Sequence, residues 1–441
     1  MTSPGITGTC TRWMARTCLA LVAACGGGGH HTTDAPPLDA VSDSIGVSGD
    51  APANGVTLHV TNGGDPVPNV VAVFLDASDK QLAAVLTDGN GTAASAMTAG
   101  GTVTAIVHQG SGLDRLVTFT AVAPGDSLVL ELSPAGPALA TAVNLTFPTN
   151  GAQVYTLYPS CGDPVASPDA TFMFRPLGCA GTADFVMSAG DATTASSFLV
   201  AMNVNIGSDA SISGAFAAPT TPAYAYANIP SAFNAVSTRA AVLGHNGPMY
   251  AVASSEALAA NQTSVTLHET LPTTATPALV TTNLWPQGAE LGQQLVADVV
   301  SDATADYTVD VTNTMLPRYT TAPAYTAATR SISWGEAPAE ASATIVRARL
   351  HAYRDDIPTG RSWTWEIAAA RTATTVTFPA LPTIDGFSFI PIASDTVGID
   401  DLTTATFPGG FDALRTSPVR DLVPALTSGH AVIESLAPPQ L

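Results

Sequence analysis

Short segments that alternate apolar and polar residues constrain the fold of this chain more than any other sequence feature. The clearest is 346–353, where VRARLHAY places small or apolar residues at every second position. Because successive side chains of a β-strand point to opposite faces, this pattern predicts a strand with one buried and one solvated face. Residues 56–60 and 307–311 alternate similarly, and 69–75 form the nearly continuous apolar run of a core strand.

The spacing of the strand-like segments indicates the type of β-fold. Between residues 55 and 134 they recur about every ten residues, separated by Gly, Pro, Asp or Asn, as is typical of β-sandwiches. The pattern is weaker in 140–272 and strongest in 278–390. We therefore expect an all-β protein built from tandem Ig-like or transthyretin-like β-sandwich domains, after a signal and a flexible tether.

Composition shifts predict six parts along the chain. These are a signal peptide (1–24), a Gly/Pro/Asp-rich tether (25–54), a first β-sandwich (55–134), a second β-rich domain (138–272), a third β-sandwich (278–390) and a C-terminal extension packing on the third domain (391–441). The tether contains few large apolar residues and is not expected to bury enough surface to order itself. The remaining length is too great for a single hydrophobic core.

Two motifs in the first predicted sandwich point to a known family. Residues 64–74 read GDPVPNVVAVF, and residues 87–93, one strand later, read TDGNGTA. Over residues 55–134 the chain resembles the carboxypeptidase regulatory-like, transthyretin-like family. The resemblance implies a sandwich that serves as a spacer or binding module without catalysis.

Charge and hydropathy exclude some classes of partner. The net charge is −20, and Lys80 is the only lysine. Such a surface repels phosphate backbones, so no nucleic-acid partner is expected. Beyond the first 25 residues no apolar stretch has the length of a membrane-spanning helix, so we expect the remainder to be soluble outside the cytoplasm. No Walker loop, dinucleotide fingerprint, zinc helix or hydrolase elbow is present, and no cofactor is expected.

The N-terminus resembles a bacterial lipoprotein signal. Arg12 and Arg16 precede the apolar segment 19–24, which ends at Cys25 and a glycine run. The resemblance implies cleavage before Cys25 and acylation of that cysteine, with the lipid bilayer as partner. The protein is then an exported, membrane-anchored lipoprotein, periplasmic or on the outer cell surface. The alternative is an ordinary secretory signal whose cleavage site precedes a cysteine.

Two further cysteines remain after the signal and Cys25. An oxidising compartment favours a disulfide between Cys161 and Cys179, worth about 3 kcal/mol for a loop of this size. A shared metal site is the alternative, although no histidine lies nearby in the sequence.

Four aspartates at a spacing of four residues form a candidate calcium site. A hairpin turning near residues 301–305 would place the first and last of them on neighbouring strands, where carboxylate oxygens could bind Ca²⁺. The alternative is that they are solvated side chains on strands and turns. The candidates are Asp298, Asp302, Asp306 and Asp310.

Arginine and tryptophan gather in the third predicted domain and suggest a surface for glycans. Tryptophan rings could stack on sugar rings while guanidinium groups bind acidic substituents. Alternatively, the tryptophans fill the core and the arginines pair with carboxylates. The candidates for the glycan surface are Trp334, Trp363, Trp365, Arg347 and Arg349.

From the sequence we expect a non-catalytic, membrane-anchored lipoprotein that serves as a structural or recognition module. Its partners would be the bilayer and, beyond it, a glycan or a surface protein. Two alternatives stay open. One is a carbohydrate-binding or adhesive surface protein, and the other is a hydrolase whose catalytic residues form no recognisable sequence motif.

Overall fold

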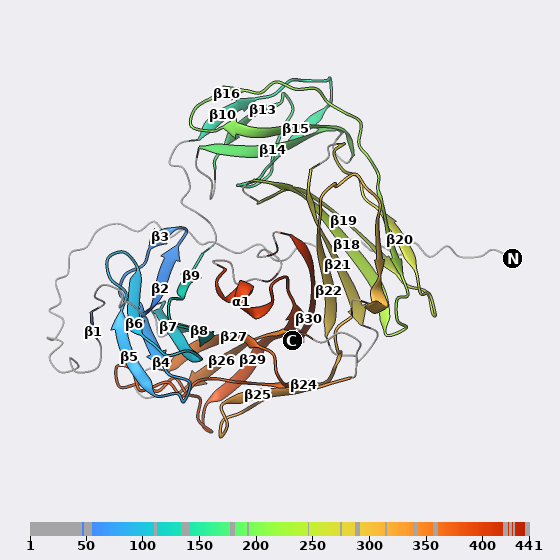
Figure 1. The fold of residues 1–441 in the computed structure, drawn as a ribbon. Helices are drawn as coiled ribbons and strands as arrows, with labels where there is room; N and C mark the ends of the chain where they lie inside the picture. The colour runs from blue at the N-terminus through green and yellow to red at the C-terminus, as the bar shows by residue number, and fades with distance from the viewer. Residues whose placement is uncertain are drawn as a thin grey trace. The chain divides into compact units, whose positions relative to one another are not determined.

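The computed structural model shows a nearly all-β protein, as the sequence predicts (Figure 1). It describes residues 46–47, 55–109, 113–133, 142–176, 181–191, 194–245, 247–273, 276–286, 292–313, 315–337, 343–355, 360–417, 422, 426 and 428–436. In these ranges the helical elements are α1 (Gly410–Arg415) and the 3-10 helix η1 (Val311–Asn313). No helix in the same ranges combines the length and apolar composition needed to cross a membrane.

Thirteen of the described strands form one hydrogen-bonded sheet. Neighbours in it are antiparallel, except for the parallel pairs β1–β5 and β8–β27. In spatial order the strands are β1 (Gly46–Val47), β5 (Gln81–Leu86), β4 (Val71–Leu75), β7 (Gly101–His108), β8 (Leu113–Val122), β27 (Arg361–Ala370), β26 (Ile345–Arg354), β29 (Thr396–Thr406), β30 (Gly429–Leu436), β22 (Gln293–Val300), β21 (Ala278–Pro286), β18 (Phe233–Gly244) and β19 (Gly247–Ala257).

The other described strands form five smaller sheets. The first contains β3 (Asp65–Pro66), β2 (Gly55–Asn62), β6 (Thr92–Ala96) and β9 (Ser127–Glu131). Two more contain β13 (Thr171–Phe174), β10 (Val143–Thr146) and β16 (Ala210–Ser211), and β12 (Val165–Ser167), β11 (Val154–Pro159), β14 (Thr182–Gly190) and β15 (Ala195–Asn205). The last two contain β20 (Val265–His268), β17 (Ala223–Ala227) and β23 (Tyr307–Asp310), and β24 (Tyr319–Thr326), β25 (Ser331–Glu336) and β28 (Thr375–Thr377).

Residues 346–353 form a strand with one buried and one solvated face, as their alternating pattern predicts. Along β26 the even-numbered residues from Val346 to Ala352 are buried, whereas Arg349, His351 and Tyr353 are exposed. All five residues of β4 are buried, which confirms the core strand expected from its apolar run. In these segments, alternation of apolar and polar residues therefore indicates a strand buried on one face, and a continuous apolar run indicates a strand buried on both faces.

Separate cores lie against different parts of the large sheet. Val56 and Leu58 of β2 pack with Phe74 of β4 and Phe119 of β8 in one core. A second core joins the central strands to β24, β25 and β28, and includes Trp365. A third joins β17, β20 and β23 to β18 and β21. Each core lies between the large sheet and a smaller one, as in layered β proteins generally, and Val186 of β14 and Phe198 of β15 also join the third.

Strand pairing crosses the divisions expected from the sequence. β21, in the predicted third domain, pairs with β18 of the predicted second domain. β29 and β30 come from the predicted C-terminal extension but pair with β26 and β22 inside the large sheet. In the predicted tether, Gly46 and Val47 pair with β5. The expected boundaries differ from the observed pairing because strands far apart in the sequence pair with one another. The backbone N–H and C=O groups of each strand need hydrogen-bond partners, and the partner strand need not be near in sequence.

Candidate functional site

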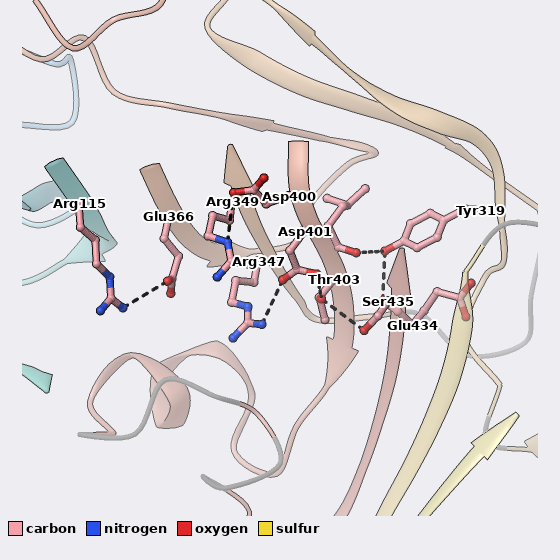
Figure 2. Close-up of polar contacts among 11 residues, drawn as sticks. Arg115, Tyr319, Arg347, Arg349, Glu366, Asp400, Asp401, Thr403, Glu434 and Ser435 are labelled. Atoms are coloured by element: carbon pink, nitrogen blue, oxygen red, sulfur yellow. Dashed lines mark hydrogen bonds and ion pairs between the residues drawn. The ribbon is translucent and has the colours of Figure 1, made fainter. Parts of the chain in front are cut away.

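A row of charged side chains crosses the central strands of the large sheet on one face (Figure 2). We call it the charged row, and it consists of Arg115 on β8, Glu366 on β27, Arg347 and Arg349 on β26, and Asp400 and Asp401 on β29. Arg115, Glu366, Arg347 and Arg349 occupy the solvated positions of strands whose alternate positions are buried, and Asp400 and Asp401 are partly exposed on β29. Oppositely charged groups on neighbouring strands stabilise a sheet when they face each other.

The charges in the row are paired across the strands. Arg347 Nη2 lies 3.0 Å from Asp401 Oδ2, and Arg349 Nε lies 3.6 Å from Asp400 Oδ2. Arg115 Nη2 lies 3.7 Å from Glu366 Oε2. Since three arginines face three carboxylates, the row presents hydrogen-bonding groups with little net charge. Partly exposed pairs of this kind each contribute about 0–1 kcal/mol to stability.

A β-bulge explains why two consecutive aspartates lie on the same face. The pairing of β26 with β29 shifts between Arg349 and Leu350, so Asp401 pairs with Arg349 while Ile399 pairs with Leu350. Asp400 is the extra residue, and its Oδ1 lies 2.5 Å from His351 Nδ1. A bulge inserts one residue and re-aims the side chains around it. A strict period of two would have placed Asp400 and Asp401 on opposite faces, so sequence periodicity alone could not find this pair.

Beyond the charged row, the short helix α1 packs on apolar residues of the same face. Phe411 and Leu414 of α1 pack on Ile345, Ala368 and Ala405, which lie next to the charged positions on the same face of their strands. The helix thus covers the apolar part of the face and leaves the charged row partly accessible to solvent. The row therefore presents partly exposed hydrogen-bond donors and acceptors on this face.

A buried carboxyl group lies on the opposite face of β30. Glu434 is fully buried, and neither of its carboxyl oxygens has a hydrogen-bond partner among the described residues. Burial raises its pKa to about 9. The Tyr319 hydroxyl lies 3.2 Å from the Glu434 carbonyl oxygen and donates toward it. The local sequence around Glu434 gives no sign of this burial, because Tyr319 of β24, far away in the chain, packs over β30.

The close approach of Glu434 to Gly292 gives a stability prediction. Gly292 has a φ of +83°, and a Cβ there would collide with the Glu434 carboxyl group and lie 2.9 Å from Tyr319 Cδ2. We expect Gly292→Ala to lower the free energy of unfolding by about 2 kcal/mol, from backbone strain and overpacking together. Urea denaturation measures this value.

The matched control is Gly386→Ala. Gly386 has a φ of +75°, but a Cβ there would meet no atom within 4 Å. It should lose only about 1 kcal/mol, the strain of the left-handed backbone. Equal losses in the two variants would show that Glu434 and Tyr319 do not restrict position 292.

The four aspartates proposed for calcium are not brought together. Asp298 is on β22 of the large sheet, whereas Asp310 is on β23, which pairs with β17. The hairpin expected to join them is therefore wrong, because each strand finds a different partner. In the described ranges, no three His, Cys, Asp or Glu side chains gather in a way that would hold a metal ion.

Each of these aspartates instead has a local hydrogen-bonding role. Asp298 Oδ1 lies 2.7 Å from His430 Nδ1, and its other oxygen accepts from the Tyr307 hydroxyl. Asp302 accepts from the hydroxyl and backbone N–H of Thr304, which lowers the pKa of Asp302. The other two accept hydrogen bonds at strand ends, namely Asp306 from the Ala223 N–H and Asp310 from the Asn228 amide.

The tryptophans proposed for glycan stacking are core residues. Trp363 and Trp365 are fully buried, and Trp334 is 5% exposed. Trp365 packs against Phe378, and its Nε1 donates to Thr118 Oγ1 at 2.9 Å. The expected stacking surface is corrected accordingly, because these rings face the sheet interior and not solvent. Arg347 and Arg349, the other members of that set, belong to the charged row.

The cysteine predictions fall largely outside the described residues. Cys161 is buried in the core that includes Phe174 and Phe185. Cys179 and Cys25 both lie outside the described ranges. The disulfide and the lipidation therefore stay predictions.

Comparison with known proteins assigns no family. No protein-family model matches the chain, and no curated protein matches its sequence. Among solved structures, the Bacillus anthracis TIE protein matches with a TM-score of 0.15 and 11% sequence identity, over 58% of this chain and 50% of that one. The aligned region thus spans half the length of that protein, and the low TM-score supports no inference about fold or function.

Proposed function

We propose that this protein is an exported lipoprotein, held at a membrane through an acylated Cys25, that serves as a non-catalytic structural or recognition module. The observation that carries the proposal is the N-terminal pattern, in which two arginines and a short apolar segment precede Cys25. An acylated N-terminus would hold the following β-sheets beside the bilayer. Placement in the periplasm or on the outer cell surface belongs to the same proposal.

The sheet architecture supports the structural part of this proposal. The described strands form a large sheet with several smaller sheets packed on it, and its charged row is held by ion pairs across β8, β27, β26 and β29. The assignment of residues 55–134 to a carboxypeptidase regulatory-like sandwich is also proposed. It is supported by the common core of β2 and β9 with β4, β7 and β8.

Metabolic labelling with palmitate tests the anchoring. We expect label in the wild-type protein and none in Cys25→Ala, because the acylated residue has been removed. Cys18→Ala is the matched control, since Cys18 lies in the segment that the signal would lose. Fractionation should move Cys25→Ala from the membrane pellet to the soluble fraction. An unlabelled wild-type protein, or a labelled Cys25→Ala variant, would contradict the proposal.

A further inference from the structure

The strands β18 and β21 present two exposed and two partly exposed side chains on the face opposite their core. Val236, Thr238, Val280 and Leu284 are buried at the core-facing positions of these strands. The intervening positions face away from that core. We call four of them the β18/β21 patch, and they are Ser237, Arg239, Asn283 and Trp285.

Trp285 is the aromatic component of this patch. Its side chain is 44% exposed, in contrast to the buried Trp334, Trp363 and Trp365. Its Nε1 lies 3.4 Å from Ser237 Oγ and donates to it, which directs the indole toward β18. Ser237 is paired with Asn283, so the ring lies beside a hydrogen-bonding amide. An indole fixed at one edge and open to solvent is suited to stacking against a ligand.

Arg239 adds an uncompensated positive charge to the same patch. It is exposed, and its guanidinium has no hydrogen bond or ion pair with any described residue. Its direct neighbours across the sheet are the uncharged residues Ala253 and Thr281. Arg239 lies two residues from Ser237, a separation of about 7 Å along a strand. Most arginines of the third predicted domain instead face carboxylates, including Arg330, Arg347, Arg354 and Arg371.

We propose that the β18/β21 patch binds an acidic saccharide. A sugar ring would stack on Trp285, its carboxylate would pair with Arg239, and its hydroxyl groups would bond to Asn283 and Ser237. This inference rests on the recognition role proposed above and names its ligand class.

Isothermal titration of the mature, full-length lipoprotein in detergent with oligogalacturonate tests this inference. The neutral comparison is a cello-oligosaccharide of equal length. We expect the wild-type protein to bind oligogalacturonate and to bind the neutral chain at least tenfold more weakly. Trp285→Ala and Arg239→Gln should each weaken oligogalacturonate binding about tenfold or more, through loss of stacking and of a charge-assisted contact.

Two matched variants control for exposure and charge. Met173→Ala removes another exposed apolar side chain, and Arg175→Gln removes another exposed arginine, both on or directly after β13. Both should bind oligogalacturonate as the wild type does. Trp285→Phe, which keeps an aromatic ring, should bind more tightly than Trp285→Ala, and thermal unfolding of each variant verifies the fold.

The outcomes separate this inference from the proposed function. No binding of oligogalacturonate, equal binding of the neutral chain, or unchanged binding by Trp285→Ala and Arg239→Gln would overturn the inference, while palmitate labelling would still test the anchoring. Shortening of the bound oligosaccharide during incubation would contradict the non-catalytic role and still support a saccharide site. Binding without shortening, lost in both patch variants, supports both.

Discussion

Replacing Glu434 with glutamine is expected to raise the free energy of unfolding by about 3 kcal/mol at pH 7. Glu434 is fully buried, and burial raises its pKa from 4.5 to about 9. At pH 7 the folded protein therefore keeps this carboxyl group protonated, whereas the unfolded chain releases the proton and gains free energy from doing so. Glutamine is neutral in both states and removes that gain.

The pH dependence follows from the direction of the pKa shift. Because the folded pKa lies above the unfolded one, the stability from the neutral carboxyl group is fully present below about pH 4.5 and is lost as the pH rises to about 9. Within this window the contribution of Glu434 falls by about 1.4 kcal/mol per pH unit.

Urea denaturation of the wild-type protein and Glu434→Gln across this pH range measures the difference between their slopes. The matched control is Glu256→Gln, an exposed position on β19, which should change stability by less than about 0.5 kcal/mol. Parallel pH profiles for the wild type and Glu434→Gln would contradict the assignment of a buried, protonated carboxyl group at position 434.

Arg354→Ala is expected to lower the free energy of unfolding by about 3–5 kcal/mol. The Arg354 guanidinium makes two hydrogen bonds to Asp395, from Nε at 2.9 Å and from Nη2 at 2.7 Å. The Asp395 side chain is fully buried. Arg354 also donates to the Ser388 carbonyl oxygen and lies over the ring of Phe387, with Cζ 4.9 Å from the centroid. Removing the guanidinium leaves a buried carboxylate without its cation.

Chemical denaturation measures this loss, and Arg349→Ala is the matched control. Arg349 is on the same strand but is half exposed, and its contact with Asp400 is 3.6 Å long, so we expect a loss below about 1 kcal/mol. The double variant Arg354→Met/Asp395→Asn should be more stable than Arg354→Ala, since it removes the orphaned charge as well. If Arg354→Ala and Arg349→Ala lost similar free energy of unfolding, burial of the Arg354–Asp395 pair would not be the reason that this pair stabilises the protein.

Part of the candidate site could be predicted from local sequence. The alternation in 346–353 correctly placed Arg347 and Arg349 on the solvated face of β26 and Val346 on the buried face. The aspartates that face these arginines were not identified, because a bulge between β26 and β29 sets their direction. Arg115 and Glu366 meet through the parallel pairing of β8 with β27, which links strands far apart in the sequence.

The tryptophans show that residue type alone does not predict whether a side chain is exposed for binding. Trp363 and Trp365 share one face of β27, and that face packs against other sheets. Trp285 has the same local context of alternating strand residues but remains exposed. Period-two patterning reports that two residues share a face, whereas burial of that face depends on what packs against it.

The sequence alone determined that this chain forms strands, and which residues of the clearest strands share a face. Both properties follow from the two-residue repeat of an extended backbone, which is local. The tertiary structure alone decided which strands pair, where the register shifts, and which charged or aromatic side chains meet solvent. These outcomes depend on backbone hydrogen bonds and core contacts between residues far apart in the chain, so the burial of Glu434 and the exposure of Trp285 could not be read from their neighbours in sequence.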